Sequence, residues 1–240
     1  MSIAIVVPAY KEAKNIENLV KSILEVLKNP FIVIVDDSPN NEIENIIKDF
    51  NNIHYVYRGK KLGRGSAIIE GMKIIIKKKE IDKIIEMDAD LIHDPKEIKG
   101  NLKIFENNNL DLLISSRYLK QSKIINWSFR RKVFSFLSNK LSKFLLGIPI
   151  TDYTNGFRIY SRRSVEHIIL NCGKIGDGFI VLSEILVELY FNNYKVEETS
   201  CIFKNRTVIE SSVNIKEISN SLLGLFKIYR RKKLLLKKLI

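Results

Sequence analysis

The chain has 240 residues, enough for an α/β domain with a sizeable core, and its 45% hydrophobic and 28% charged residues exclude a disordered protein. A net charge of +13 favours an anionic partner: a phosphorylated substrate, an acidic membrane surface or nucleic acid. No uncharged run approaches the roughly 18 residues of a membrane-spanning helix, so we expect none.

Apolar runs alternate with helical patterns over the first half of the chain. Five short runs predict strands at 3–8, 31–35, 53–57, 83–87 and 110–115. An amphipathic helix is predicted by the spacing of Ile16, Leu19, Val20, Ile23, Leu24 and Leu27. Further helices are expected around 43–47 and from Gly63 to Ile76. This alternation predicts an α/β fold, a Rossmann-like, mostly parallel sheet with helices on both faces.

Two segments of the second half predict basic amphipathic helices. Residues 128–147 carry an apolar stripe of Phe129, Val133, Phe134, Phe136, Leu137, Leu141, Phe144 and Leu145. The second begins at a capping box of Asn214 and Glu217, and residues 215–240 hold eight basic residues against one acid. Such helices suit the headgroup region of a membrane. Alternatively, the first packs in the core and the second forms a coiled coil or a disordered end.

An acidic pair follows the fourth predicted strand, in Met87-Asp88-Ala89-Asp90. Residues two apart in an extended chain point to the same side, so Asp88 and Asp90 can converge on one cation. Carboxylate oxygens suit Mg²⁺ or Mn²⁺, with a diphosphate completing the coordination. The alternative is an acidic turn that only caps a helix, which Asp94 also fits.

Other strand ends carry residues suited to a nucleotide. Val6–Glu12 ends the first strand and Val35–Pro39 ends the second, so their acidic side chains can bind ribose hydroxyls or base N–H groups. Leu62-Gly63-Arg64-Gly65-Ser66-Ala67 places glycines and a helix N-terminus where a phosphate can bind. Ligands of open parallel sheets bind at the carboxyl ends of the strands, where all these motifs lie.

These motifs, in this order, resemble those of family 2 glycosyltransferases with the GT-A fold, in the dolichyl-phosphate mannose synthase branch. Pro8–Glu12 resembles Pro-Thr-Tyr-Asn-Glu, and Asp36–Pro39 resembles the Asp-Asp-x-Ser nucleotide motif. Leu62–Ala67 resembles Leu-Gly-Leu-Gly-x-Ala, and Asp88–Pro95 resembles Asp-Ala-Asp-Leu-Gln-His-Pro-Pro. The resemblance extends over residues 1–212.

Three later motifs add to the resemblance. Ser115–Tyr118 matches Gly-Ser-Arg-Tyr from its second residue on. Asp152–Arg158 resembles Asp-x-Thr-Ser-Gly-Phe-Arg, and Phe203–Arg206 resembles a late Phe-x-x-Arg segment. The match therefore includes both halves of the expected domain.

The resemblance implies a role for individual side chains. Nucleotide binding is expected from Pro8, Tyr10, Glu12, Asp36, Asp37, Gly65, Asp88 and Arg206. Asp88 and Asp90 would hold the metal, Mg²⁺ or Mn²⁺. The acceptor phosphate would be bound by Arg117, Arg131 and Ser135. The residues expected to be catalytic are Asp88, Asp90, Arg117 and Arg131.

Two departures from the family pattern affect these roles. Ile92 replaces the glutamine of Asp-Ala-Asp-Leu-Gln, so the metal has one ligand fewer if that glutamine binds it. Asp94 or water then substitutes, or metal affinity is weaker. The late motif Arg-x-x-Gly-x-Ser-Lys loses its glycine and lysine over 206–212, which leaves the choice of nucleotide-sugar open.

The resemblance implies inverting transfer of a hexose, with mannose favoured, from a nucleotide-sugar such as GDP-mannose to dolichyl or polyprenyl phosphate. We expect a GT-A domain over 1–212 and a basic amphipathic membrane-interface helix over 213–240. The protein would be peripheral, at the cytoplasmic face of the cell membrane. It would lack a signal peptide, since residues 1–7 carry no basic region, and a disulfide framework, since it has only Cys172 and Cys201.

Other functions remain open at this stage. A UDP-sugar-dependent enzyme could transfer glucose or N-acetylhexosamine to a lipid phosphate or another acceptor. A processive glycosyltransferase is disfavoured because Gln-x-x-Arg-Trp is missing, and a nucleotidyltransferase because Pro8-Ala9-Tyr10 stands where it needs glycines. A non-catalytic basic membrane- or nucleic-acid-binding protein is the alternative of another class. No nucleic-acid-binding module is recognised, so we expect no nucleic acid partner.

Overall fold

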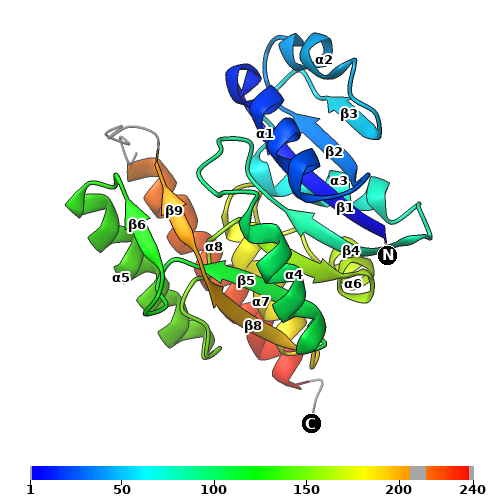
Figure 1. Cartoon of the computed structure of the whole chain (residues 1–240). Coiled ribbons are helices and arrows are strands. Elements are labelled where there is room, and N and C mark those ends of the chain that lie inside the picture. Colours follow the sequence, from blue (N-terminus) through cyan, green and yellow to red (C-terminus); the bar gives the residue numbers. More distant parts are fainter. Residues whose placement is uncertain (1, 206–214, 238–240) are drawn as a thin grey trace.

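The computed structural model describes residues 2–205 and 215–237 and contains a seven-stranded sheet (Figure 1). Its strands are β1 (Ser2–Ala9), β2 (Phe31–Asp36), β3 (Ile53–Tyr57), β4 (Ile81–Glu86), β5 (Leu112–Ser116), β7 (Arg158–Ser161) and β8 (Val196–Ser200). They are arranged in the order β3-β2-β1-β4-β7-β5-β8. Every neighbouring pair is parallel except those of β7, which is antiparallel to β4 and β5. The prediction of a mostly parallel sheet is confirmed.

Helices cover both faces of the sheet, as predicted. One face packs against α1 (Ala13–Val26), α2 (Glu42–Ile47) and α4 (Glu97–Asn107). The other packs against α3 (Arg64–Ile75), α6 (Arg162–Asn171) and α7 (Ile180–Tyr190). Successive residues of β1 supply both cores: Ala4 and Val6 face one, while Ile5 and Val7 face the other. Because both faces are buried, the strand is continuously apolar rather than alternating.

Helices α1 and α3 show how local sequence sets this packing. The spacing predicted for α1 is confirmed at Ile16, Leu19, Val20 and Ile23, which are buried, whereas Leu24 is 37% exposed. In α3, a Cβ added at Gly71 would lie 2.3 Å from Cγ2 of Val6. The glycine therefore lets α3 lie close against the sheet, with its N-terminus beside the strand ends.

The remaining elements lie on the side of the molecule away from α1 and α2 (Figure 1). They are the parallel ribbon of β6 (Lys123–Ile125) and β9 (Ile202–Lys204), with α5 (Phe129–Leu146) and α8 (Ile215–Lys237). Ser128 caps α5 by accepting a hydrogen bond from the Arg131 amide, and Gly147 ends it with φ +68°.

Helix α8 packs against α7. Leu225, Ile228 and Leu235 of α8 are buried in the main core. An ion pair of 3.0 Å joins Nε of Arg231 to Oε2 of Glu188. One side of the basic C-terminal helix thus belongs to the folded domain, while Leu223, Phe226 and Leu234 are exposed. The predicted capping residue Asn214 lies outside the described residues.

Candidate active site

The carboxyl ends of β1, β2 and β4 meet at one edge of the sheet. Ala9 is in register with Asp36, and Val6 with Glu86, so the residues that follow these strands lie on adjacent loops. Of the predicted nucleotide residues, Pro8 is buried near the end of β1, and Tyr10 is exposed just after this strand. The ammonium group of Lys61 lies 4.8 Å from the centre of the Tyr10 ring. Glu12 is half-buried and accepts a hydrogen bond from the Asn15 side chain.

The carboxylates of Asp36 and Asp37 hold the neighbouring loops. Asp36 is fully buried and accepts hydrogen bonds from the Ser38 amide at 2.8 Å and from the Tyr55 hydroxyl at 2.9 Å. Asp37 pairs with Arg58 and accepts the amides of Leu62 at 2.9 Å and Gly63 at 2.8 Å. Asp37 thereby ties the β2 loop to the glycine motif, and the nucleotide contacts of both residues stay predictions.

The glycine motif packs tightly against the segment before α7. Gly63 has φ +101°, and a Cβ there would lie 2.5 Å from the Asp177 carbonyl oxygen. A Cβ at Gly65 would lie 2.4 Å from Cγ2 of Val181, and the Gly65 amide donates a hydrogen bond to the Asp177 carbonyl oxygen at 2.6 Å. No larger side chain fits at either position, and the predicted phosphate contact of Gly65 stays a prediction.

The acidic pair after β4 lies beside a buried arginine. Nε of Arg64 donates to Oδ1 of Asp88 at 2.7 Å, and its Nη1 lies 2.7 Å from Oε1 of Glu86. Burial alone would lower the pKa of Arg64, but Asp88 and Glu86 together raise it, so the guanidinium stays charged. Asp90 accepts the Ile92 amide at 3.1 Å.

The donor chemistry of this pair fits a divalent cation in part. Asp88 and Asp90 supply carboxylate oxygens, the ligands that Mg²⁺ and Mn²⁺ prefer. Within residues 2–205 and 215–237, however, no group of three or more His, Cys, Asp or Glu side chains could hold a metal. Ile92 adds no ligating side-chain atom. A metal bound here would therefore need oxygens from a diphosphate or from water.

His93 connects this loop to the segment after α5. Its Nε2 lies 2.8 Å from Oδ1 of Asn155, and its ring packs against Phe157 and Phe203. Burial lowers the pKa of His93 to about 4, so the imidazole is neutral at pH 7. His93 lies within the Asp88–Pro95 motif, but this role was not predicted from the sequence.

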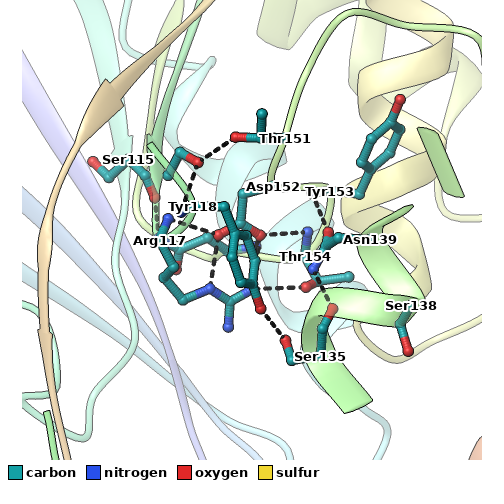
Figure 2. A network of polar contacts seen from close by, with 12 residues as sticks. Ser115, Arg117, Tyr118, Ser135, Ser138, Asn139, Thr151, Asp152, Tyr153 and Thr154 are labelled. Carbon is teal, nitrogen blue, oxygen red and sulfur yellow. Dashed lines mark hydrogen bonds and ion pairs between the residues drawn. The ribbon is translucent and has the colours of Figure 1, made fainter. Parts of the chain in front are cut away.

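Arg117 is held by Asp152, a buried carboxylate 35 residues away in sequence (Figure 2). Its Nε and Nη2 each donate to Asp152 at 2.7 Å, and Nη2 also donates to the Thr154 hydroxyl at 2.8 Å. Burial alone would raise the pKa of Asp152, but Arg117 holds it below its ordinary value. The pair fixes the orientation of the guanidinium, with Nη1 left out of these hydrogen bonds. Asp152 opens the Asp152–Arg158 motif, but its role in holding Arg117 was not predicted from the sequence.

Trp127 brings the two predicted acceptor arginines together. The guanidinium of Arg131 lies 4.3 Å from the Trp127 ring centre and that of Arg117 lies 5.4 Å from it. Burial and the charge of Arg117 lower the pKa of Arg131, while Asp90 opposes the shift. The Tyr118 hydroxyl donates to Ser135 at 2.5 Å, on the same helix as Arg131 (Figure 2). The structure thus brings Arg117, Arg131, Ser135 and Asp90 into one region, and Arg206 lies outside the described residues.

Helix α5 turns its apolar stripe outward. Phe129 is 80% and Phe144 is 83% exposed, and every other residue of the stripe except Leu145 is also exposed. Its buried positions include the polar Asn139, whose Oδ1 accepts the Tyr153 amide at 2.7 Å (Figure 2). Leu146, at the end of the helix, is buried in the main core. Polar contacts and this leucine hold the helix to the domain, while the stripe presents its hydrophobic side chains to the surroundings. Among the described residues, no helix is long and apolar enough to cross a membrane.

Comparisons with known proteins show which family the sequence is similar to. The family model of glycosyl transferase family 2 matches residues 4–169. The chain is 30% identical over 221 residues to a polyprenol monophosphomannose synthase of Mycolicibacterium smegmatis, which covers 89% of this chain and 82% of that protein. It is also 30% identical over 239 residues to a dolichol-phosphate mannosyltransferase of Pyrococcus furiosus. That match covers 96% of this chain and 64% of the other protein.

Solved structures resemble the fold as a whole. A Mycobacterium tuberculosis glucosyl-3-phosphoglycerate synthase, in complex with Mn²⁺, UDP and glucosyl-3-phosphoglycerate, matches with a TM-score of 0.66 and 15% identity. The match covers 96% of this chain and 79% of that one. A complex of the same enzyme with Mn²⁺, UDP-glucose and phosphoglyceric acid gives a TM-score of 0.67 at 16% identity, over 95% and 79% of the two chains. At such identity these matches show the fold alone, and they confirm that it is GT-A-like.

Proposed function

The chain belongs to glycosyl transferase family 2, and on this premise we propose that it transfers a hexose, with mannose favoured, from a nucleotide-sugar such as GDP-mannose to dolichyl or polyprenyl phosphate. Sugar transfer itself follows from the family. The lipid phosphate and the mannose are supported by the two relatives, which are named for polyprenol monophosphomannose and dolichol-phosphate mannosyl chemistry.

One observation carries the acceptor assignment. Arg117 and Arg131 both lie beside the Trp127 ring, and the charge of Asp90 acts on Arg131. Asp90 belongs to the acidic pair expected beside the nucleotide-sugar. Two guanidinium groups near it suit an acceptor phosphate, which must reach the sugar of that bound nucleotide-sugar. Because Asp152 holds Arg117 through Nε and Nη2, the contact with the acceptor falls to its Nη1 and to Arg131.

The proposed reaction needs no strong general base. A phosphate monoester has a second pKa of about 6, so at pH 7 it is largely a dianion and already nucleophilic. Arg117 and Arg131 would orient it toward the anomeric carbon of the sugar, and attack opposite the leaving nucleoside diphosphate inverts the configuration. Positioning and charge stabilisation would then supply most of the rate enhancement. Held by Asp88 and Asp90, Mg²⁺ or Mn²⁺ would neutralise the leaving diphosphate.

The exposed stripe of α5 supports delivery from a membrane. A polyprenyl chain stays in the bilayer, so the enzyme must approach the headgroups. Phe129 and Phe144 can enter the interface, while the exposed Arg130, Lys132 and Lys140 on the same helix face anionic lipids. Each such basic residue near an anionic surface contributes about 1 kcal/mol. The proposal therefore includes a peripheral position of the protein at the cytoplasmic face of the cell membrane.

A transfer assay with paired donors and acceptors tests the proposal. The purified chain is incubated with Mg²⁺ or Mn²⁺, a short polyprenyl phosphate in mixed micelles, and GDP-mannose, UDP-glucose or UDP-N-acetylglucosamine in separate reactions. We expect a mannosyl lipid from GDP-mannose and none when the unphosphorylated polyprenol replaces its phosphate. Transfer from a UDP-sugar alone would overturn the mannose assignment, and transfer that does not require the lipid phosphate would overturn the acceptor assignment.

A further inference from the structure

Arg64 is an unusual residue for its position in the chain. It is the first residue of α3, between Gly63 and Gly65, where the resembled motif Leu-Gly-Leu-Gly has leucine. Its side chain is only 11% exposed, and it reaches across to β4 and the loop that follows. There it pairs with Glu86 and with Asp88, the carboxylate expected to hold the metal.

The surroundings of Arg64 hold the guanidinium in this place. A Cβ at Gly156 would lie 2.0 Å from Nη2 of Arg64 and 2.8 Å from Oδ2 of Asp88, so only glycine leaves room for the pair. The Phe179 ring covers the guanidinium, with its centre 5.1 Å from Cζ. Glu86 is fixed in turn by the Tyr160 hydroxyl, which donates to it at 2.7 Å. These contacts describe a built site for one positive charge.

This charge competes with any divalent cation at Asp88. Oδ1 of Asp88 is already engaged by Nε of Arg64 at 2.7 Å. A cation on the same carboxylate would be repelled by the guanidinium at short range, in partly buried surroundings where charges interact strongly. With Asp90 as the other carboxylate and Ile92 in the next expected ligand position, the protein alone offers a cation little compensation.

We propose that Arg64 is an internal counter-ion of Asp88 that disfavours cation binding to the free protein, so that the cation binds together with the diphosphate of the donor. The inference rests on the metal role given to Asp88 in the proposed function. A nucleoside diphosphate brings negative charge that can lie between the metal ion and the Arg64 guanidinium, which offsets the repulsion between them. Arg64 thereby makes metal binding dependent on the donor.

Mn²⁺ binding, measured on the full chain by the electron paramagnetic resonance signal of free Mn²⁺, tests this without any turnover. Arg64→Leu leaves the buried Glu86 unpaired, so it is combined with Glu86→Gln, which leaves the net charge of the site unchanged. We expect this double variant to bind Mn²⁺ at least about tenfold more tightly than the unmodified protein without nucleotide. The unmodified protein should gain at least as much affinity when GDP is added, and the double variant less.

Two further variants make the result interpretable. Arg163→Leu also removes one arginine from an ion pair, with Asp111 at the opposite edge of the sheet, and should leave Mn²⁺ affinity unchanged. Arg64→Lys keeps the charge but lacks the fork that spans two carboxylates, so an intermediate affinity is expected. It replaces the double variant if circular dichroism shows that the latter is unfolded.

The outcomes separate the two claims. Equal Mn²⁺ affinity of the folded Arg64 variants and the unmodified protein would overturn the counter-ion role and leave the proposed transfer reaction intact. If no variant binds Mn²⁺ with or without GDP while sugar transfer proceeds, both the metal role of Asp88 and the counter-ion role are wrong. Tighter binding by the Arg64 variants, with a smaller gain on adding GDP, supports the inference.

Discussion

Replacing Asp152 by asparagine removes the negative partner of a buried arginine. Asp152 is fully buried, the Arg117 side chain is 8% exposed, and two bonds of 2.7 Å join them. Removing one partner of a buried ion pair destabilises a protein by about 3–5 kcal/mol, because the remaining charge has neither water nor a counter-ion. For a chain of this size that lowers the unfolding temperature by about 6–20 °C. The asparagine side chain would also place its NH₂ group, a hydrogen-bond donor, opposite the N–H groups of Arg117.

Urea unfolding measures this loss, followed by circular dichroism for the whole fold and by fluorescence for Trp127. Trp127 is the only tryptophan and lies next to Arg117, so its emission reports the site directly. Glu166→Gln is the matched control: it breaks the surface pair with Arg162 and should change stability by less than about 1 kcal/mol. A loss below about 1 kcal/mol for Asp152→Asn, or additive losses in the double variant with Arg117→Gln, would refute a coupled buried pair.

Three other predictions concern pH, the α5 surface and the metal. His93 has a pKa of about 4 when folded and 6.5 when unfolded, so unfolding takes up a proton between these values. The free energy of unfolding should therefore fall by about 1.5 kcal/mol from pH 6.5 to 5 in urea titrations, and an unchanged pH dependence in His93→Asn would contradict this. Replacing both Phe129 and Phe144 by serine should weaken flotation with anionic liposomes by tenfold or more without lowering the unfolding temperature, whereas Leu170→Ser, an exposed leucine on α6, should change neither; equal flotation of the two variants would argue against α5 as the membrane face. Asp90→Asn should reduce transfer in the presence of Mg²⁺ or Mn²⁺ by about 100-fold or more, and full activity would remove Asp90 from the site.

The layered fold could be predicted because its signals are local. Continuous apolar runs marked β1 and β2, and the spacing of Ile16 to Ile23 marked the buried side of α1. The antiparallel β7 was not predicted, since it is only four residues long and contains the fully buried Arg158, which reads as a surface residue. Arg158 is tolerated there because it donates to the carbonyls of Asn155, Leu182 and Tyr153, a set that only the tertiary fold assembles.

The candidate site divides in the same way. The motif order predicted which residues follow adjacent strands, and the structure brings Arg117, Arg131 and Ser135 close together. Their partners were not predictable, because Asp152 is 35 residues from Arg117 and no local pattern links them. The direction of the α5 stripe also required the structure, since a helical spacing shows that a hydrophobic face exists but not whether it is covered.

The dependence of transfer on the lipid phosphate tests the central claim most directly. Rates are measured against polyprenyl phosphate concentration for Arg131→Ala, Arg131→Lys and the control Lys103→Ala, which removes an exposed basic residue of α4. Losing a hydrogen bond to a charged phosphate removes about 1.5–3 kcal/mol, so Arg131→Ala should raise the KM for the lipid phosphate about tenfold or more. The KM for the nucleotide-sugar should be unchanged, Arg131→Lys should be less affected, and Lys103→Ala should behave as the unmodified protein. An unchanged acceptor KM in Arg131→Ala, or the same increase in Lys103→Ala, would contradict the account.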